Sequence, residues 1–259
     1  MCTRREKMAL GVMAGYIALM AIGLGVWRFA FGIYYADANF GKTYVIVEAA
    51  MCTFAWFGWR WIERTHFSGD EKPIPPTFGK IRRAWVFAPF ALTLGYAVLV
   101  LLIDGHVPDS VWPVVSLLIL VAFVGFSEEL IFRGVVLRNF MAERSVFVAI
   151  VVSATGFSLL HSVNVIGGLP LQDVLMQMAS TFSAGLLFAG LYLCLNSLWP
   201  LMIYHALFDF SLLASGLFGV DMQYHLVPLT LLEYLLVIPI VWWVATRYKV
   251  PQDEMMLNT

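Results

Sequence analysis

The chain has 259 residues, of which 61% are hydrophobic and 13% are charged; its net charge is −1 and its mean hydropathy is +0.81. Because soluble domains carry about 25% charged residues, this composition excludes an ordinary soluble domain and indicates an integral membrane protein. A net charge so close to zero says nothing about partners, whereas the positions of the charges are informative.

Apolar runs between charged or turn-rich breaks predict the membrane-spanning helices. About 20 apolar residues are needed for one span, so this chain has room for about eight, joined by short loops. We therefore expect one all-α domain, residues 1–259, built as a bundle of about eight transmembrane helices around an intramembrane polar site. The first span contains Gly11-x-x-x-Gly15, a weak helix-packing motif. The expected spans are 8–34, 43–62, 84–103, 111–132, 146–164, 174–195, 198–218 and 226–246.

The basic residues predict the orientation of these spans. With eight crossings, nearly all of them fall on one side of the membrane, and only Arg28 and Lys42 fall near the other. The positive-inside rule then places both termini in the cytoplasm and makes the chain a multi-pass protein. The basic groups on the cytoplasmic side are Arg4, Arg5 and Lys7 before the first span, residues 60–83 after the second, Arg133, Arg138 and Arg144 after the fourth, and Arg247 and Lys249 after the last.

Two adjacent carboxylates, Glu128 and Glu129, lie in an apolar run that continues to Arg133. One such charge at the centre of a membrane helix costs roughly 2.5–3.5 kcal/mol, so ionisable groups at this depth indicate function. Glu129 and Arg133 are four residues apart, so their side chains meet on one helix face and can pair. Glu128 points about 100° away from Glu129, so it has other partners. A purely structural clamp is the alternative for Glu129 and Arg133.

Two further pairs with a four-residue spacing occur in later spans. Phe157 and His161 share one face of the fifth span, and His205 and Asp209 share one face of the seventh. A carboxylate four residues from a histidine can fix the tautomer of its imidazole. Each pair alone is a weak signal, but three pairs on three spans predict one polar site within the bilayer.

These motifs resemble the CPBP family of intramembrane proteases, which includes the CAAX prenyl proteases and the bacteriocin-processing or Abi proteins. The family pattern is Glu-Glu-x-x-x-Arg, then Phe-x-x-x-His, then His-x-x-x-Asn or Asp, on successive helices of an eight-helix fold. The matching core covers about residues 84–218. The residues that match are Glu128, Glu129, Arg133, Phe157, His161, His205 and Asp209.

The resemblance implies a glutamate-dependent peptidase with no metal and no other cofactor. Glu128, with His161, would activate a water molecule, and His205 with Asp209 would stabilise the oxyanion. The prenyl proteases carry Asn in place of Asp209, and an ionised Asp cannot donate a hydrogen bond; Asp209 would then be protonated or would orient His205. Glu128 and His205 lie toward the cytoplasmic ends of their expected spans, so the site should open to that side.

The expected partners are membrane lipids and a peptide or a lipidated, membrane-anchored protein as substrate, with no nucleic acid. Within this class the sequence leaves a prenylated C-terminal peptide, a leader peptide and a sorted protein open as substrates.

Four alternative functions remain open at this point. Glu, His and Asp are credible zinc ligands, although no His-Glu-x-x-His element is present. A serine peptidase would use Ser127, Ser158 or Ser162, but no Gly-x-Ser-x-Gly element surrounds them. A non-catalytic scaffold or immunity protein is a third alternative. An ion or proton pathway is the fourth, although no repeated halves are visible.

Overall fold

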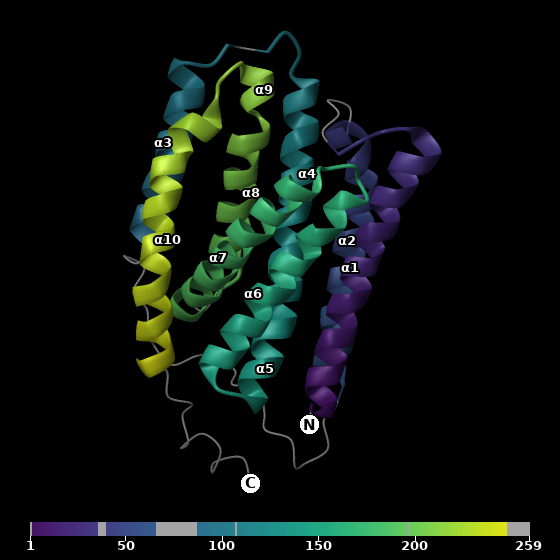
Figure 1. Ribbon diagram of the computed structural model, residues 1–259, viewed down its shortest axis with the longest axis vertical. Coiled ribbons are helices and arrows are strands. Elements are labelled where there is room, and N and C mark those ends of the chain that lie inside the picture. Colours follow the sequence, from purple (N-terminus) through teal and green to yellow (C-terminus); the bar gives the residue numbers. More distant parts are fainter. Residues whose placement is uncertain (1, 36–39, 66–86, 107, 196, 248–259) are drawn as a thin grey trace.

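The computed structural model describes residues 2–35, 40–65, 87–106, 108–195 and 197–247, and these residues form helices and no strands. The prediction of an all-α fold is therefore confirmed. Successive long helices run up and down along the bundle (Figure 1). The helices are α1 Arg4–Phe31, α2 Phe40–Arg64, α3 Ala88–Ile103, α4 Trp112–Glu129, η2 Leu130–Leu137, α5 Arg138–Glu143, α6 Val146–Ser162, η3 Val163–Val165, α7 Leu171–Leu195, α8 Trp199–Leu213, α9 Ser215–Phe218 and α10 Met222–Arg247.

Each of the eight expected spans coincides with a helix, but the helices differ in length and composition. Among the described residues, five are long and apolar enough to cross a membrane. The remaining three spans correspond to α2, which is less apolar, and to α3 and α8, which have 16 and 15 residues. The protein is thus an integral membrane protein. The five are Arg4–Phe31, Trp112–Glu143, Val146–Val165, Leu171–Leu195 and Tyr224–Arg247.

The expected end of the fourth span at residue 132, with Arg133 in a connecting loop, is wrong. The helix continues from α4 through the π-helical segment η2 and α5 to Glu143. Arg133 does not end the helix, because its side chain is fully buried and paired within the helix. Glu128 consequently lies near the middle of a 32-residue helix rather than near its end.

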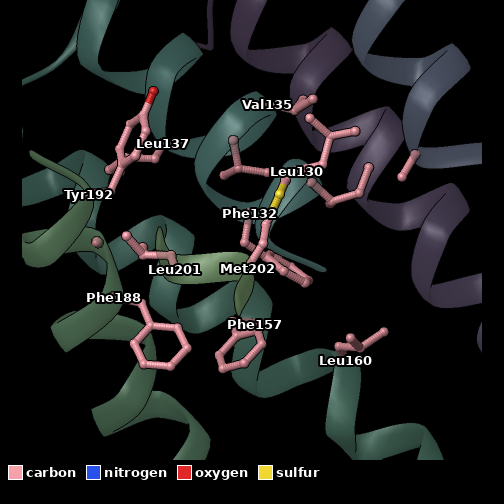
Figure 2. Close-up of a cluster of buried hydrophobic side chains, with 14 of the residues drawn as sticks. Leu130, Phe132, Val135, Leu137, Phe157, Leu160, Phe188, Tyr192, Leu201 and Met202 are labelled. Atoms are coloured by element: carbon pink, nitrogen blue, oxygen red, sulfur yellow. The ribbon is translucent and has the colours of Figure 1, made fainter. Parts of the chain in front are cut away.

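The segment η2 occupies the centre of the bundle. All eight of its residues are buried, so this helix is enclosed on every side. Figure 2 shows Leu130 and Phe132 of η2 among Phe157 of α6, Phe188 of α7 and Leu201 of α8. The residues that directly follow the two glutamates are therefore held by helices from distant parts of the chain.

Two glycines allow these helices to approach each other closely. A Cβ atom on Gly125 of α4 would lie 2.6 Å from the Met202 carbonyl oxygen and 3.0 Å from the Ala206 nitrogen of α8. A Cβ atom on Gly185 of α7 would lie 2.8 Å from the Cα of Ala154 in α6. In both cases the obstacle is backbone, so a side chain would separate the helices that carry the motif residues.

Candidate active site

The ion pair expected between Glu129 and Arg133 is present at the centre of the bundle. Arg133 Nη1 donates to Glu129 Oε1 at 2.8 Å, and both side chains are fully buried. A buried charge is tolerated when its partner is close and hydrogen-bonded. The pair therefore removes most of the cost of placing two charges in an apolar helix.

The guanidinium of Arg133 has further partners from two other helices. Its Nη2 donates to the carbonyl oxygen of Gly185 at 3.3 Å. Its central carbon lies 4.6 Å from the ring centroid of Phe157 and 5.2 Å from that of Phe188, within the range of cation–π attraction. Arg133 thus links its own helix to α6 and α7.

His205 lies between the two glutamates and Asp209. Its Nδ1 is 2.9 Å from Glu129 Oε1. Its Nε2 is 3.8 Å from Glu128 Oε2 and 3.4 Å from Asp209 Oδ2. Residues 76 positions apart are therefore in contact, and α8 supplies an imidazole to the carboxylates of α4.

These contacts show that Nδ1 of His205 is a hydrogen-bond donor. Glu129 Oε1 is an acceptor already bonded to the Arg133 cation, so Nδ1 of His205 carries a proton and donates it. Nε2 is then the nitrogen that faces Glu128 and Asp209. The sequence pairs His205 with Asp209 alone, whereas in the structure Glu129 also holds this ring.

Each glutamate has a buried Oε2 without a hydrogen-bond partner, but Glu129 is bonded to Arg133 and His205 through Oε1, whereas Glu128 makes no hydrogen bond to a described residue. The residue is 5% exposed, and its buried Oε2 makes no hydrogen bond to a described residue. The separation of 3.8 Å from His205 Nε2 is too long for a direct hydrogen bond. A buried carboxylate oxygen in this state needs a water molecule or another ligand.

His161 lies at the end of α6, beside the Phe157 ring. Its Nδ1 is 2.9 Å from the Phe157 carbonyl oxygen, which only accepts, so Nδ1 donates and Nε2 of the neutral ring is left with a lone pair. The Phe157 centroid is 5.2 Å from the His161 ring and 5.8 Å from the His205 ring. Phe157 therefore contacts both motif histidines and the Arg133 cation.

The structure brings the seven predicted residues to one region, but their contacts are unequal. Glu129, Arg133, Phe157 and His205 form a continuous set of contacts. The contacts described for Glu128 are with His205 rather than with His161. His161 and Asp209 are only partly buried, so this side of the region is more open.

Several residues of this region were not selected from the sequence. Tyr16 of α1 has its hydroxyl 2.7 Å from Ser127 Oγ, directly beside Glu128. Glu48 of α2 is 4% exposed and lies within electrostatic range of Glu128 and Asp209. Glu48 carried the same signal as the motif residues, since it is a carboxylate within an apolar span. The contact of Tyr16 with Ser127 could not be expected from the sequence, because tyrosine is a common residue in membrane helices.

The three serines considered as nucleophiles are bonded to backbone carbonyl groups. Ser127 donates to Val124, Ser158 to Met178 and Ser162 to Leu159. This is the common behaviour of serines in membrane helices, and it does not provide the serine–histidine contact that a serine nucleophile requires. Within the described part of the chain, no group of three or more His, Cys, Asp or Glu side chains has the geometry to hold a metal ion.

Residues 110–211 match the family model described as Type II CAAX prenyl endopeptidase Rce1-like. The resemblance to the intramembrane proteases is confirmed. The matched segment extends from just before α4 into α8 and contains all seven motif residues. A peptidase family implies hydrolysis of a peptide bond in a peptide or protein substrate at the membrane. No curated protein and no solved structure matches the chain.

Proposed function

We propose that this protein is an intramembrane endopeptidase in which Glu128 activates water, without a metal, for attack on a peptide bond near the end of a membrane-associated substrate. The observation that carries the proposal is the difference between the two glutamates. Glu129 accepts hydrogen bonds from Arg133 and His205 through Oε1, whereas Glu128 makes no hydrogen bond to a described residue and its approach to His205 is 3.8 Å. A general base must be free to accept a proton, and Glu128 meets this condition.

In the proposed reaction, Glu128 accepts a proton from a water molecule as the water oxygen adds to the peptide carbonyl carbon. His161 assists by accepting a hydrogen bond from the same water through Nε2. The carbon–nitrogen bond then breaks, and the departing amine takes the proton from Glu128. These steps return the site to its starting protonation state and need no other reactant.

His205 and Asp209 are assigned to the developing oxyanion. Glu129 holds Nδ1 of His205, so Nε2 points toward the region beside Glu128. In this role His205 is the imidazolium, with a proton on each nitrogen, a form that the neighbouring carboxylates of Glu128 and Asp209 favour. Its Nε2 then donates toward the developing negative charge, and a donor fixed in advance stabilises the transition state. Asp209, 3.4 Å from Nε2, is assigned to orienting the ring, because an ionised carboxylate accepts and does not donate.

The first substrate to test is a prenylated C-terminal peptide, because the matching family is named for prenyl endopeptidases. Leader peptides and membrane-proximal ends of other proteins form the second group. All of these substrates deliver a peptide bond to a polar site within the bilayer, so one arrangement of residues serves each of them.

The decisive experiment replaces Glu128 with Gln, which keeps the size of the side chain and removes the proton acceptor. Purified protein in lipid nanodiscs is incubated with a farnesylated CAAX peptide, and products are followed by mass spectrometry. We expect turnover to fall by about 10²–10⁴-fold, the range for a lost general base, while thermal stability is retained. A Glu128→Gln protein that cleaves at the wild-type rate would contradict the proposal.

A matched control is Glu233→Gln. Glu233 of α10 is also a buried carboxylate, but it is occupied by the hydroxyl of Tyr204, 3.2 Å from both oxygens. This variant should change turnover far less than Glu128→Gln. Running both with a chelator separates the zinc alternative, under which wild-type activity and bound zinc would be lost together. A scaffold function predicts that Glu128→Gln keeps its function in cells.

We further propose that both termini face the cytoplasm. The start of α1 and the end of α10 lie at the same end of the bundle (Figure 1), as an even number of crossings requires. Most basic residues lie near the two termini or in the expected connections on the same side as the termini, which supports the positive-inside assignment. Reporter fusions after residues 70 and 221 should report opposite sides of the membrane; the same side for both would refute the topology.

A further inference from the structure

A groove of about 1170 Å³ lies between α1 and α2, outside the region of the motif residues. No motif residue lines it; its walls are formed by residues 4–19 of α1 and 50–61 of α2. Most of the lining is apolar, and Phe57 and Trp61 are 66% and 55% exposed at its edge. The groove has no role in the proposed reaction, so it calls for a separate explanation.

Glycines create this groove. A Cβ atom on Gly15 would meet the Phe54 ring at 2.8 Å, and one on Gly58 would meet Val12 at 2.8 Å, so the helices are in contact at these positions. A Cβ atom on Gly11 would have no neighbour within 4 Å. The Gly11-x-x-x-Gly15 motif therefore packs the two helices at Gly15 and leaves them apart at Gly11.

The end of the groove nearest the N-terminus carries two cations. Arg4 and Lys7 line it and are both exposed, with no ion pair to a described residue. The neighbouring basic residues are arranged differently, because Arg5 pairs with Glu143 and Arg144 pairs with Glu6. The groove is thus mostly apolar and carries positive charge at the end nearest the N-terminus.

We propose that this groove is a binding site for one anionic phospholipid. The phosphate of the head group pairs with Arg4 and Lys7, and an acyl chain lies along the hollow at Gly11. Basic pockets between membrane helices on the cytoplasmic side bind anionic head groups in this way. A docked protein helix would fit the apolar walls but would cover the two cations without a countercharge, so the charge favours a lipid.

The orientation of the aromatic residues is consistent with a lipid that enters from the surface. Trp61 lies at the end of α2 that pairs with the start of α1, at the level of Arg4 and Lys7. Tryptophan is enriched at the boundary between head groups and acyl chains. The head group would therefore contact the cations Arg4 and Lys7, and the start of the acyl chain would contact the ring of Trp61.

The test uses a phosphatidylglycerol that carries a photoactivatable group in its acyl chain. The full-length protein in phosphatidylcholine nanodiscs is labelled with this probe, and adducts are mapped by mass spectrometry. We expect adducts on residues 4–19 and 50–61, displaced by unlabelled phosphatidylglycerol but not by phosphatidylcholine. Equal labelling by a matched phosphatidylcholine probe would overturn the proposal, since it would indicate bulk lipid only.

A Cβ atom at Gly11 meets nothing within 4 Å, so Gly11→Phe can place its ring in the groove and should abolish the labelling. The matched control is Gly95→Phe on α3, because a Cβ atom at Gly95 also meets nothing within 4 Å. The control should be labelled like the wild type. Retained labelling in Gly11→Phe would refute the site.

The charge is tested by Arg4→Gln and Lys7→Gln. Each cation near an anionic head group contributes on the order of a fivefold change in affinity, so the double variant should bind about 30-fold more weakly. Arg64→Gln, at the exposed end of α2, serves as the control and should change binding little. A double variant with wild-type affinity would refute the assignment of the head group. Peptidase activity is not needed for any of these measurements.

Discussion

The two sides of the candidate active site differ in how completely their polar groups are paired. On one side, Glu129, Arg133 and His205 bond to one another beneath the rings of Phe157 and Phe188. On the other side, Glu128 makes no hydrogen bond to a described residue, since His205 Nε2 is 3.8 Å away, and the Asp209 side chain is 28% exposed. The comparison shows that the same residue type at adjacent positions serves two tasks, because the helix turns about 100° between them.

The paired side provides stability and the unpaired side provides reactivity. Removing one member of a buried ion pair leaves an uncompensated charge, so the paired side should be sensitive to substitution in stability measurements. Substitution of an unpaired proton acceptor affects the reaction instead. Variants on each side therefore separate the two roles.

The largest expected effect on stability comes from Arg133→Met. This change leaves Glu129 charged and buried and should lower the free energy of unfolding by about 3–5 kcal/mol. Equilibrium unfolding in mixed detergent micelles measures the loss. The double variant Glu129→Gln/Arg133→Met removes both charges and should recover part of it, and a single variant as stable as the wild type would contradict the role of the pair.

A smaller effect is expected from Gly125→Ala, which acts on the distance between α4 and α8, the helices that contribute residues to both sides. The added methyl group meets the backbone of α8 and should cost about 1–3 kcal/mol, the range for overpacking. It should also lower turnover by moving His205 away from the glutamates. Gly95→Ala has open space and is the control. Unchanged turnover in Gly125→Ala would show that the separation of α4 and α8 is unimportant.

Much of the fold and the position of the candidate site were predictable because charges in apolar segments are rare. Each ionisable motif residue is conspicuous for this reason, and a spacing of four residues implies a shared helix face. The helical class and the positions of the helices follow from the length of the apolar runs. Residues of the correct type at the correct spacing therefore indicated the site without knowledge of the contacts between helices.

Other features were not predictable because they depend on which helices are neighbours. The bond between Glu129 and His205 joins α4 to α8, and no local spacing indicates it. The continuation of the helix past Arg133 was missed because an arginine was read as the end of a span. Glu48 is also a carboxylate in an apolar span, like the glutamates of the motif. It is harder to recognise from the sequence because no charged residue or histidine lies four positions away from it.

The spacing of the contacts in the site also has a consequence for biosynthesis. The Glu129–Arg133 pair is four residues apart, so it forms as soon as this helix forms, before any later helix has been made. The contact between Glu129 and His205 requires a helix that is translated 76 residues later. The helix with the two glutamates can therefore enter the bilayer with one charge pair already neutralised, while Glu128 lacks His205 until α8 arrives. A partly synthesised chain consequently has a stable fourth helix but no complete site.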